Sequence, residues 1–261
     1  MSRTLPTDRE YEVVSVPFNR PLVWLGRGWS DLMRCPLPGL LHGLVAALFG
    51  AALIWLGRGH FWFLAGAFSG FLLVAPLLAT GLYAVSRSLA YGRQATLATA
   101  LEAWRPRDSR LVRFGLLLAL AGTGWVLTSA SLITRFASAP VNSPLDFLRI
   151  VVLSSDDNHL FEAWIVLGSV LAAPIFASSV VAIPMLLDRP YGVLTAVTTS
   201  IASALFNPAA MALWATLILA FTLLGMGTLM IGMIVVMPWL AHSSWHAYRD
   251  LVRTLPIGDR R

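Results

Sequence analysis

The chain has 261 residues, of which 57% are hydrophobic and only 12% are charged, and its mean hydropathy is +0.73. Soluble domains carry about a quarter charged residues, so this composition excludes an ordinary water-soluble protein. The formal net charge is +6, but the arginines are scattered through flanks and loops and form no continuous basic stripe. Nucleic acid is therefore not an expected partner, whereas the lipid bilayer is.

The N-terminal segment is polar and rich in proline. Residues 1–36 contain no apolar run followed by a small-residue cleavage site, so we expect no cleaved signal peptide. We predict a cytoplasmic tail over residues 1–19, a single transmembrane domain over 20–252 and a second cytoplasmic tail over 253–261.

Five apolar stretches meet or approach the length that a helix needs to cross a hydrocarbon core of about 30 Å. They are 37–57, 61–85, 114–133, 163–187 and 208–241. The last would extend about 50 Å as one helix, which is too long for a bilayer. We therefore predict two helices, 208–224 and 228–248, with the turn at Gly225-Met226-Gly227. The expected fold is an all-α transmembrane bundle of six spans.

Arginine placement favours six spans over five. Short cytoplasmic segments collect positive charge. With six spans and a cytoplasmic N-terminus, sixteen of the nineteen arginines lie inside, whereas five spans would leave only twelve there. Both termini are expected in the cytoplasm.

Each odd-numbered span begins at a proline, a residue suited to the first turn of a helix because its missing N–H would have no partner there. These prolines are Pro36, Pro106 and Pro208. The even-numbered spans carry Pro76, Pro174 and Pro238, at which we expect kinks. The pattern predicts three repeats, about 20–87, 88–189 and 190–250, each made of an elbow and a helical hairpin.

The elbows are amphipathic stretches that precede the odd-numbered spans. We expect them to lie as helices in the headgroup plane. The apolar stripe of the first elbow is Leu22, Leu25, Trp29 and Leu32, that of the second is Leu97, Leu101 and Trp104, and that of the third is Leu194, Val197, Ile201 and Leu205. In the first elbow, Asp31 is expected mostly off the stripe.

Two pairs of glycines have the small-xxx-small spacing that lets helices approach closely. They are Gly39 with Gly43 and Gly66 with Gly70. Packing within the monomer is the favoured interpretation, and a homo-oligomer interface is the alternative.

The candidate chemistry is sparse. No Asp, Glu or Arg lies in the central part of any predicted span, which argues against ion-coupled transport. No nucleotide-binding, metalloprotease or serine-hydrolase motif occurs in a suitable context, so no catalytic residues are predicted. Residues 154–159 cluster oxygen ligands without the spacing of a calcium loop, and a solvated turn that caps the next helix is favoured there.

Three histidines are the candidate cofactor-binding residues. His242 and His246 stand four residues apart on one helix face, and His42 begins the first span on the same side of the membrane. Imidazoles so placed could ligate haem or a metal ion. Histidines that hydrogen-bond to headgroups or neighbouring helices are the commoner arrangement, so no cofactor is predicted.

Three segments carry a resemblance to a known family: WLGRGWSDLMRCPLPGLLHGL, AIPMLLDRPYGVLTAV and VVMPWLAHSSWHAYRDLV. They resemble a family of bacterial integral membrane proteins of unknown function, over about Pro21 to Val252. The resemblance implies a bacterial inner-membrane location. Some members are labelled putative cytochrome c oxidase subunits, which implies at most a small accessory subunit here, because a catalytic subunit needs more spans and intramembrane histidine ligands.

The expected function is a non-catalytic accessory, assembly or scaffolding component, with other membrane proteins or a second copy as partners. One alternative is a permease for a small neutral or lipid-like solute, because repeated hairpins can rock around a central site. Another is a haem-binding accessory subunit of a respiratory oxidase.

Overall fold

The computed structural model describes residues 11–56, 60–62, 64, 66, 78–103, 109–153 and 159–254. These residues form helices joined by loops, with one small antiparallel sheet. The helices are α1 (Arg20–Arg34), α2 (Pro36–Leu56), α4 (Thr80–Ala90), α5 (Leu97–Glu102), α6 (Ser109–Phe136), α7 (Pro144–Asp146), the π-helix η1 (Phe147–Val152), α8 (Leu160–Ser179), α9 (Ala182–Asp188), α10 (Val193–Phe206), α11 (Pro208–Gly227) and α12 (Met233–Leu251). Strand β1 (Tyr11–Val13) pairs with β2 (Val252–Thr254) and joins the two ends of the described chain.

Four helical segments of the described chain are long and apolar enough to cross a membrane: Pro36–Leu56, Arg110–Phe136, Leu160–Asp188 and Pro208–Gly227. The predicted second span, 61–85, lies largely outside the described residues, as do Pro76 and Pro106. Helix α12 is not among the four, because its C-terminal half carries two histidines, two serines, an arginine and an aspartate. An all-helical membrane fold is thus confirmed, whereas six spans and a threefold repeat stay predictions.

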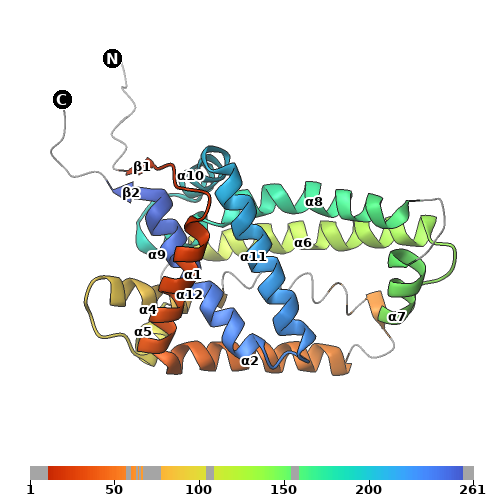
Figure 1. Cartoon of the computed structure of the whole chain (residues 1–261), viewed down its shortest axis with the longest axis horizontal. Coiled ribbons are helices and arrows are strands. Elements are labelled where there is room, and N and C mark those ends of the chain that lie inside the picture. Colours follow the sequence, from red (N-terminus) through yellow and green to blue (C-terminus); the bar gives the residue numbers. More distant parts are fainter. Residues whose placement is uncertain are drawn as a thin grey trace, which may run out of the picture.

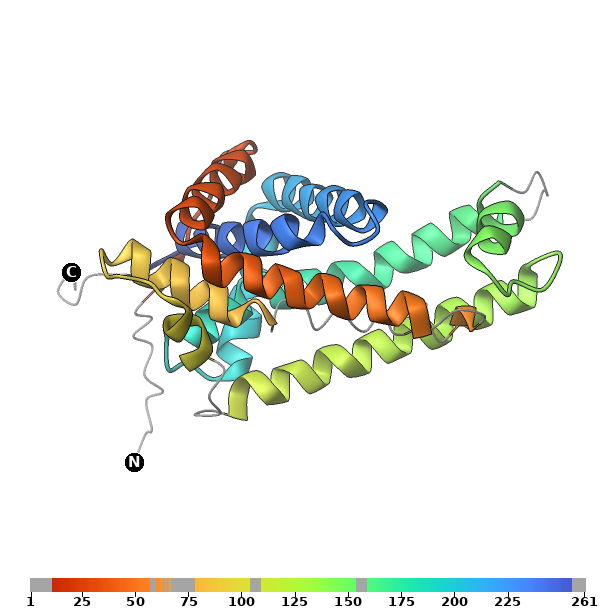
Figure 2. The ribbon, with the colours of Figure 1, turned by 90° about the horizontal axis from the view of Figure 1, so that it is seen from below.

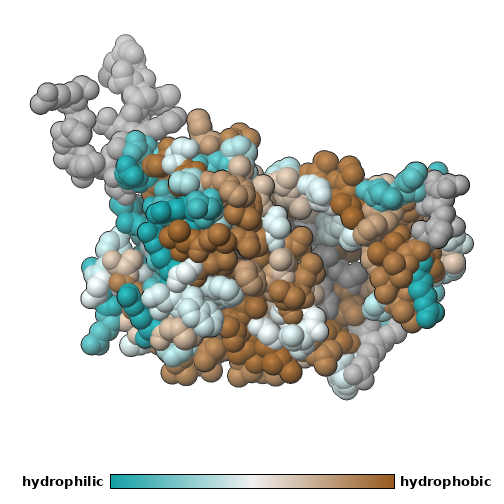
Figure 3. Space-filling view, viewed as in Figure 1, coloured by the Kyte–Doolittle hydropathy of each residue, from teal (hydrophilic) through white to brown (hydrophobic). Residues whose placement is uncertain are grey.

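The molecule is elongated, and α2, α6 and α8 run along its long axis, whereas α11 and α12 cross it obliquely (Figure 1). Helices α6 and α8 lie side by side as a long hairpin, while α1, α4, α5 and α9 gather at the end where β1 and β2 meet (Figures 1 and 2). Hydrophobic residues cover much of the middle of the visible face, and hydrophilic residues gather toward its two ends (Figure 3). This pattern is expected of a protein whose middle part is surrounded by the hydrocarbon core of a membrane.

Two of the three spans that were predicted to follow an elbow begin at a proline. Helix α2 begins at Pro36 directly after α1, and α11 begins at Pro208 directly after α10. The last apolar run is two helices, as predicted, but its turn is Thr228–Gly232 and not Gly225-Met226-Gly227. Thr228 Oγ1 donates to the carbonyl of Gly225 at 2.8 Å and accepts from the N–H of Gly232 at 2.7 Å, which holds the turn further along the chain.

The elbow helices α1 and α10 expose apolar side chains. In α10, Leu194, Ile201 and Leu205 are exposed, while the opposite face buries Ala196, Thr199, Ser200 and Ser203. Small polar residues thus pack inward and large apolar ones face outward, as expected against lipid.

In α1 the predicted apolar stripe is divided between two environments. Leu22 and Trp29 are exposed, whereas Leu25 and Leu32 are buried. Asp31 lies off that stripe, as expected, but it is buried, with 5% of its surface exposed. It is buried because α1 packs its Trp24–Gly28–Asp31 face against α12.

Helix α12 packs closely against both α1 and α2. A Cβ atom on Gly28 would lie 2.6 Å from the backbone nitrogen of Ser243, and one on Gly43 would lie 2.6 Å from the carbonyl carbon of Ile234. One on Gly39 would lie 3.2 Å from Pro238 Cβ. The Gly39–Gly43 pattern therefore serves packing within the monomer, as predicted, whereas Gly70 lies outside the described residues.

The helix of the fourth span breaks between α8 and α9. Pro174 lies inside α8 and Pro238 lies inside α12, and neither helix ends at its proline. The break comes at Val180 and Val181, and Pro184, in the first turn of α9, has no N–H to donate to the carbonyl of Val180 four residues before it. Ser200 Oγ enters the gap: it donates to the carbonyl of Ala177 at 2.6 Å and accepts from the N–H of Val181 at 3.0 Å.

Candidate functional site

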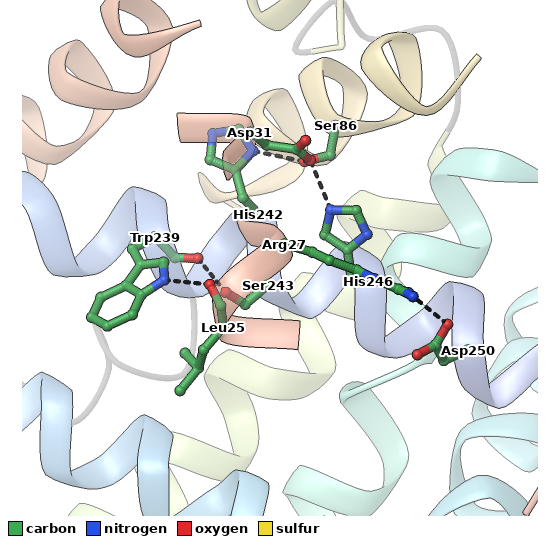
Figure 4. A network of polar contacts seen from close by, with 9 residues as sticks. All are labelled: Leu25, Arg27, Asp31, Ser86, Trp239, His242, Ser243, His246 and Asp250. Carbon is green, nitrogen blue, oxygen red and sulfur yellow. Dashed lines mark hydrogen bonds and ion pairs between the residues drawn. The ribbon is translucent and has the colours of Figure 1, made fainter. Parts of the chain in front are cut away.

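A buried polar network joins α1, α4 and α12 (Figure 4). The Oδ2 atom of Asp31 accepts a hydrogen bond of 2.7 Å from Ser86 Oγ and lies 2.8 Å from Nε2 of His246. Ser86 Oγ also lies 2.7 Å from Nδ1 of His242. Three helices far apart in sequence are therefore linked through one carboxylate and one hydroxyl.

The proton positions in this network follow from the groups present. The single hydroxyl proton of Ser86 is donated to Asp31, so the bond between Ser86 and His242 uses a proton on Nδ1 of His242. In a neutral imidazole this leaves Nε2 of His242 as an acceptor. That atom is buried and has no hydrogen-bond partner in the described part of the chain.

Opposing effects set the ionisation of Asp31. Burial acts to raise its pKa, while the hydrogen bonds from His246 and Ser86 and the charges of His246 and His242 lower it, and the balance leaves the pKa below 3.8. Asp31 is therefore a carboxylate at neutral pH, and side chains of the protein contact it in place of water.

The three predicted histidines turn toward different partners. His246 contacts Asp31, His242 contacts Ser86, and Nδ1 of His42 lies 2.7 Å from the carbonyl of Pro38 in its own helix. Within the described residues no three His, Cys, Asp or Glu side chains gather as metal ligands do. The contact with Asp31 occupies Nε2 of His246, so this histidine could bind a haem or a metal only through Nδ1.

Sequence reasoning missed Asp31 and Ser86. The signal for Asp31 was its helical spacing from Trp24 and Gly28, residues that mark the buried face of α1. Ser86 carried no comparable signal, because a lone serine near the end of an apolar stretch is common.

Two more carboxylates are held by positive groups nearby. Asp250 accepts from Arg20 Nε at 2.6 Å, Trp24 Nε1 at 2.9 Å and Arg27 Nη1 at 3.1 Å. Asp188 accepts from the hydroxyl of Tyr248 at 2.9 Å, and Arg249 Nη1 lies 3.7 Å from it. At this end of the molecule, charged side chains connect helices.

A different kind of site lies between the candidate spans. An apolar cleft of about 730 Å³ is lined by residues of α8, α10, α11 and α12, with Ala79 and Tyr83 from the start of α4. Eight alanines form much of its wall: Ala79, Ala172, Ala173, Ala177, Ala204, Ala212, Ala215 and Ala241. Small side chains leave this space open where larger ones would let the helices close together.

The polar groups in the cleft wall are few and bonded locally. Thr216 Oγ1 donates to the carbonyl of Ala212 and Ser244 Oγ to that of Leu240, each one helical turn back. The hydroxyl of Tyr83 lies close to that of Ser244. No Asp, Glu, Arg or His side chain lines the cleft among the described residues, so it is suited to an apolar occupant.

Comparison with known proteins adds the family. No curated protein and no solved structure matches the chain. Residues 63–188, which include α4 to α9, match the family model described as "Predicted integral membrane protein (DUF2189)", and this part of the chain confirms the resemblance to an integral membrane protein family of unknown function.

Proposed function

We propose that this integral membrane protein binds a lipid-like molecule in the apolar cleft between α8 and α11. The cleft itself is the observation that supports the proposal. Its volume of about 730 Å³ lies within the range of about 300–1,000 Å³ that is usual for small-molecule sites. Two of its walls belong to candidate membrane spans, so hydrocarbon chains surround its opening and can enter from the side.

The chemistry of the wall favours an acyl chain over other occupants. A charged solute would find no ion pair there, and burying it would cost several kcal/mol. The Tyr83–Ser244 pair could hydrogen-bond an ester or hydroxyl of a lipid-like molecule whose chain lies along the alanines. This role corresponds to the permease expectation, with binding as its first step.

A cleft-filling substitution tests the proposal. We expect lipid to co-purify with the protein in mild detergent and to be seen by native mass spectrometry. Ala212→Phe should reduce bound lipid about tenfold, because the ring occupies the cleft. Leu120→Phe is the matched control, because Leu120 is 70% exposed on α6 outside the cleft. Equal lipid retention in both variants, with unchanged thermal unfolding, would reject the proposal.

Transport is a further step with a separate measurement. If the site serves a permease, vesicles containing the protein should take up or flip a lipid-like solute faster than empty vesicles, and Ala212→Phe should slow the process. Equal rates in both kinds of vesicle would leave binding without transport.

The membrane arrangement that goes with this function is six spans in the inner membrane with both termini in the cytoplasm. The hairpin of α11 and α12 supports it, because α12 returns toward the end of the molecule where α11 begins (Figure 1). With α12 as a span, the arginines of the C-terminal segment lie on the same side as those of α1.

An accessory, assembly or scaffolding role is the second candidate. It is favoured by the use of Asp31, Asp188 and Asp250 to join helices instead of lining a reaction site. This role requires a stable partner. Isolation of the protein alone from gently solubilised native membranes would contradict it.

The haem-binding alternative depends mainly on His242. Its Nδ1 bond to Ser86 resembles the outer contact that fixes the tautomer of a metal-ligating histidine. The Nδ1 contact of His42 with the carbonyl of Pro38 is of the same kind, so His42 is the candidate for a second axial ligand. A purified protein without a Soret band would reject this role.

A further inference from the structure

A second, basic pocket lies at the end of the molecule where β1 meets β2. It has a volume of about 360 Å³ and is lined by the chain at 14–17, which leads from β1 to α1, and by Arg20, Arg249, Asp250 and Arg253. It is separate from the apolar cleft, because the two share no lining residue.

The pocket carries a net positive charge. Three guanidinium groups and one carboxylate line it, and that carboxylate already accepts hydrogen bonds from Arg20, Trp24 and Arg27. Burial acts to raise the pKa of Asp250, but these hydrogen bonds and charges lower it below 3.8, so it stays ionised at neutral pH. Asp250 therefore orients Arg20 without cancelling the charge of the other two arginines.

Arg253 is the arginine with the most freedom to take up a ligand. Its side chain is 68% exposed, and its ion pair with Glu12 is long, at 3.9 Å. Arg249 is 37% exposed, lies 3.7 Å from Asp188 and donates to the hydroxyl of Tyr91 at 3.4 Å. Both contacts of Arg249 are at the long end of their ranges, so its guanidinium can also serve a stronger acceptor.

We propose that this pocket binds a phosphate group. Arginine presents a planar fork of N–H donors that matches phosphate oxygens, and such charge-assisted pairs are about twice as strong as neutral hydrogen bonds. Arg249 and Arg253 supply the main contacts, and Arg20 supplies a third, oriented donor. The phosphate belongs to a phospholipid headgroup or to a soluble phosphate compound.

The surroundings favour the headgroup. Phe18 and Leu22, on either side of Arg20 in sequence, are 61% and 55% exposed. Apolar side chains next to a basic pocket are typical of a surface at the headgroup level, where the apolar groups enter the acyl region and the arginines meet phosphates. The anionic phosphatidylglycerol headgroup is therefore the first ligand to test.

The experiment uses the full-length protein, delipidated in detergent. Phosphatidylglycerol is titrated in one arm and inorganic phosphate in the other, and thermal unfolding and native mass spectrometry report binding. We expect Arg253→Gln to weaken binding about fivefold, the double variant Arg249→Gln with Arg253→Gln to weaken it further, and added salt to reduce it in the wild type. Arg149→Gln, an exposed arginine of η1 at the far end of the molecule, is the control.

The two arms separate the sources of phosphate. Binding of phosphatidylglycerol with no response to inorganic phosphate assigns the pocket to a headgroup, and a response to inorganic phosphate alone assigns it to a soluble ligand. Equal binding by the wild type and Arg253→Gln, or no binding in either arm, would overturn the proposal. If Arg253→Gln fails to fold, Arg253→Lys keeps the charge without the planar fork and should still bind more weakly than the wild type.

Ala212→Phe separates this proposal from the one for the apolar cleft. It fills the cleft and leaves the basic pocket intact, so the phosphatidylglycerol response that remains in Ala212→Phe is assigned to the basic pocket, and adding Arg253→Gln should weaken that response about fivefold. Failure of lipid retention in the cleft and failure of phosphate binding are then distinct results.

Discussion

Asp31 joins α1 to α4 through Ser86 and to α12 through His246, so its removal should weaken both contacts. We predict that Asp31→Asn lowers the free energy of unfolding at pH 7 by about 1.5–3 kcal/mol, which is typical for hydrogen bonds to a buried charged group. The amide has no negative charge for the contact with His246, although its oxygen can still accept from Ser86. Thermal unfolding in detergent measures the effect, with Glu102→Gln on the exposed side of α5 as the control.

The same carboxylate predicts a pH dependence. The folded-state pKa of Asp31 lies below 3.8, whereas an unfolded aspartate has a pKa of about 3.9. Its contribution to stability is therefore fully present above the unfolded pKa and is lost as pH falls through the folded pKa. The difference in unfolding temperature between wild type and Asp31→Asn should shrink from pH 7 to about pH 3. A constant difference would show that the charge of Asp31 adds nothing to stability.

At the scale of the element, Ser200 bridges the break between α8 and α9 with two hydrogen bonds. It replaces the missing bond between the N–H of Val181 and the carbonyl of Ala177. We predict that Ser200→Ala lowers stability by about 1–3 kcal/mol, because buried backbone groups then lack partners, and that it speeds hydrogen exchange at the Val181 amide. Thr198→Ala is the matched control, because Thr198 is exposed on the same helix and bonds only to α10 carbonyls. Equal exchange in both variants would contradict the role of Ser200.

Sequence periodicity predicted several elements well. The starts of α2 and α11 at proline were evident because proline suits a first helical turn, and the length of the last apolar run required a break. The position of that break was wrong because side-chain hydrogen bonds of Thr228 decide it, and these depend on three-dimensional geometry. The break near Pro184 was not predicted, because Pro174 is also a proline within the span and lies closer to its middle.

The site was harder to predict than the elements. A shared face for His242 and His246 followed from their four-residue spacing, but their partners come from α1 and α4, which are separated from them by more than 150 residues. Contacts of this kind depend on how α12 packs, and one sequence gives no direct measure of that. The apolar cleft was equally hidden, because alanines in membrane helices usually mark close packing and not an opening.

At the scale of the whole molecule, the direction in which the spans cross the bilayer is the remaining prediction. Both polar ends of the molecule carry arginine, but the end formed by α1, α4 and α12 carries more of it. Cytoplasmic segments collect arginine, so this end should face the cytoplasm, and the loop containing α7 and η1 and the turn between α11 and α12 should face the other side.

Single cysteines placed in a Cys35→Ser background can measure this topology with a membrane-impermeant maleimide. Asn142→Cys, before α7, and Leu229→Cys, in the turn after α11, should be labelled from outside the inner membrane. Arg93→Cys, between α4 and α5, should be labelled only after the membrane is opened. Leu229 is 81% exposed, so its label reports accessibility and not burial within the protein. Labelling of Asn142→Cys from outside with protection of Leu229→Cys would mean that α11 and α12 do not form a transmembrane hairpin, because the turn between them must reach the outer surface if both helices cross.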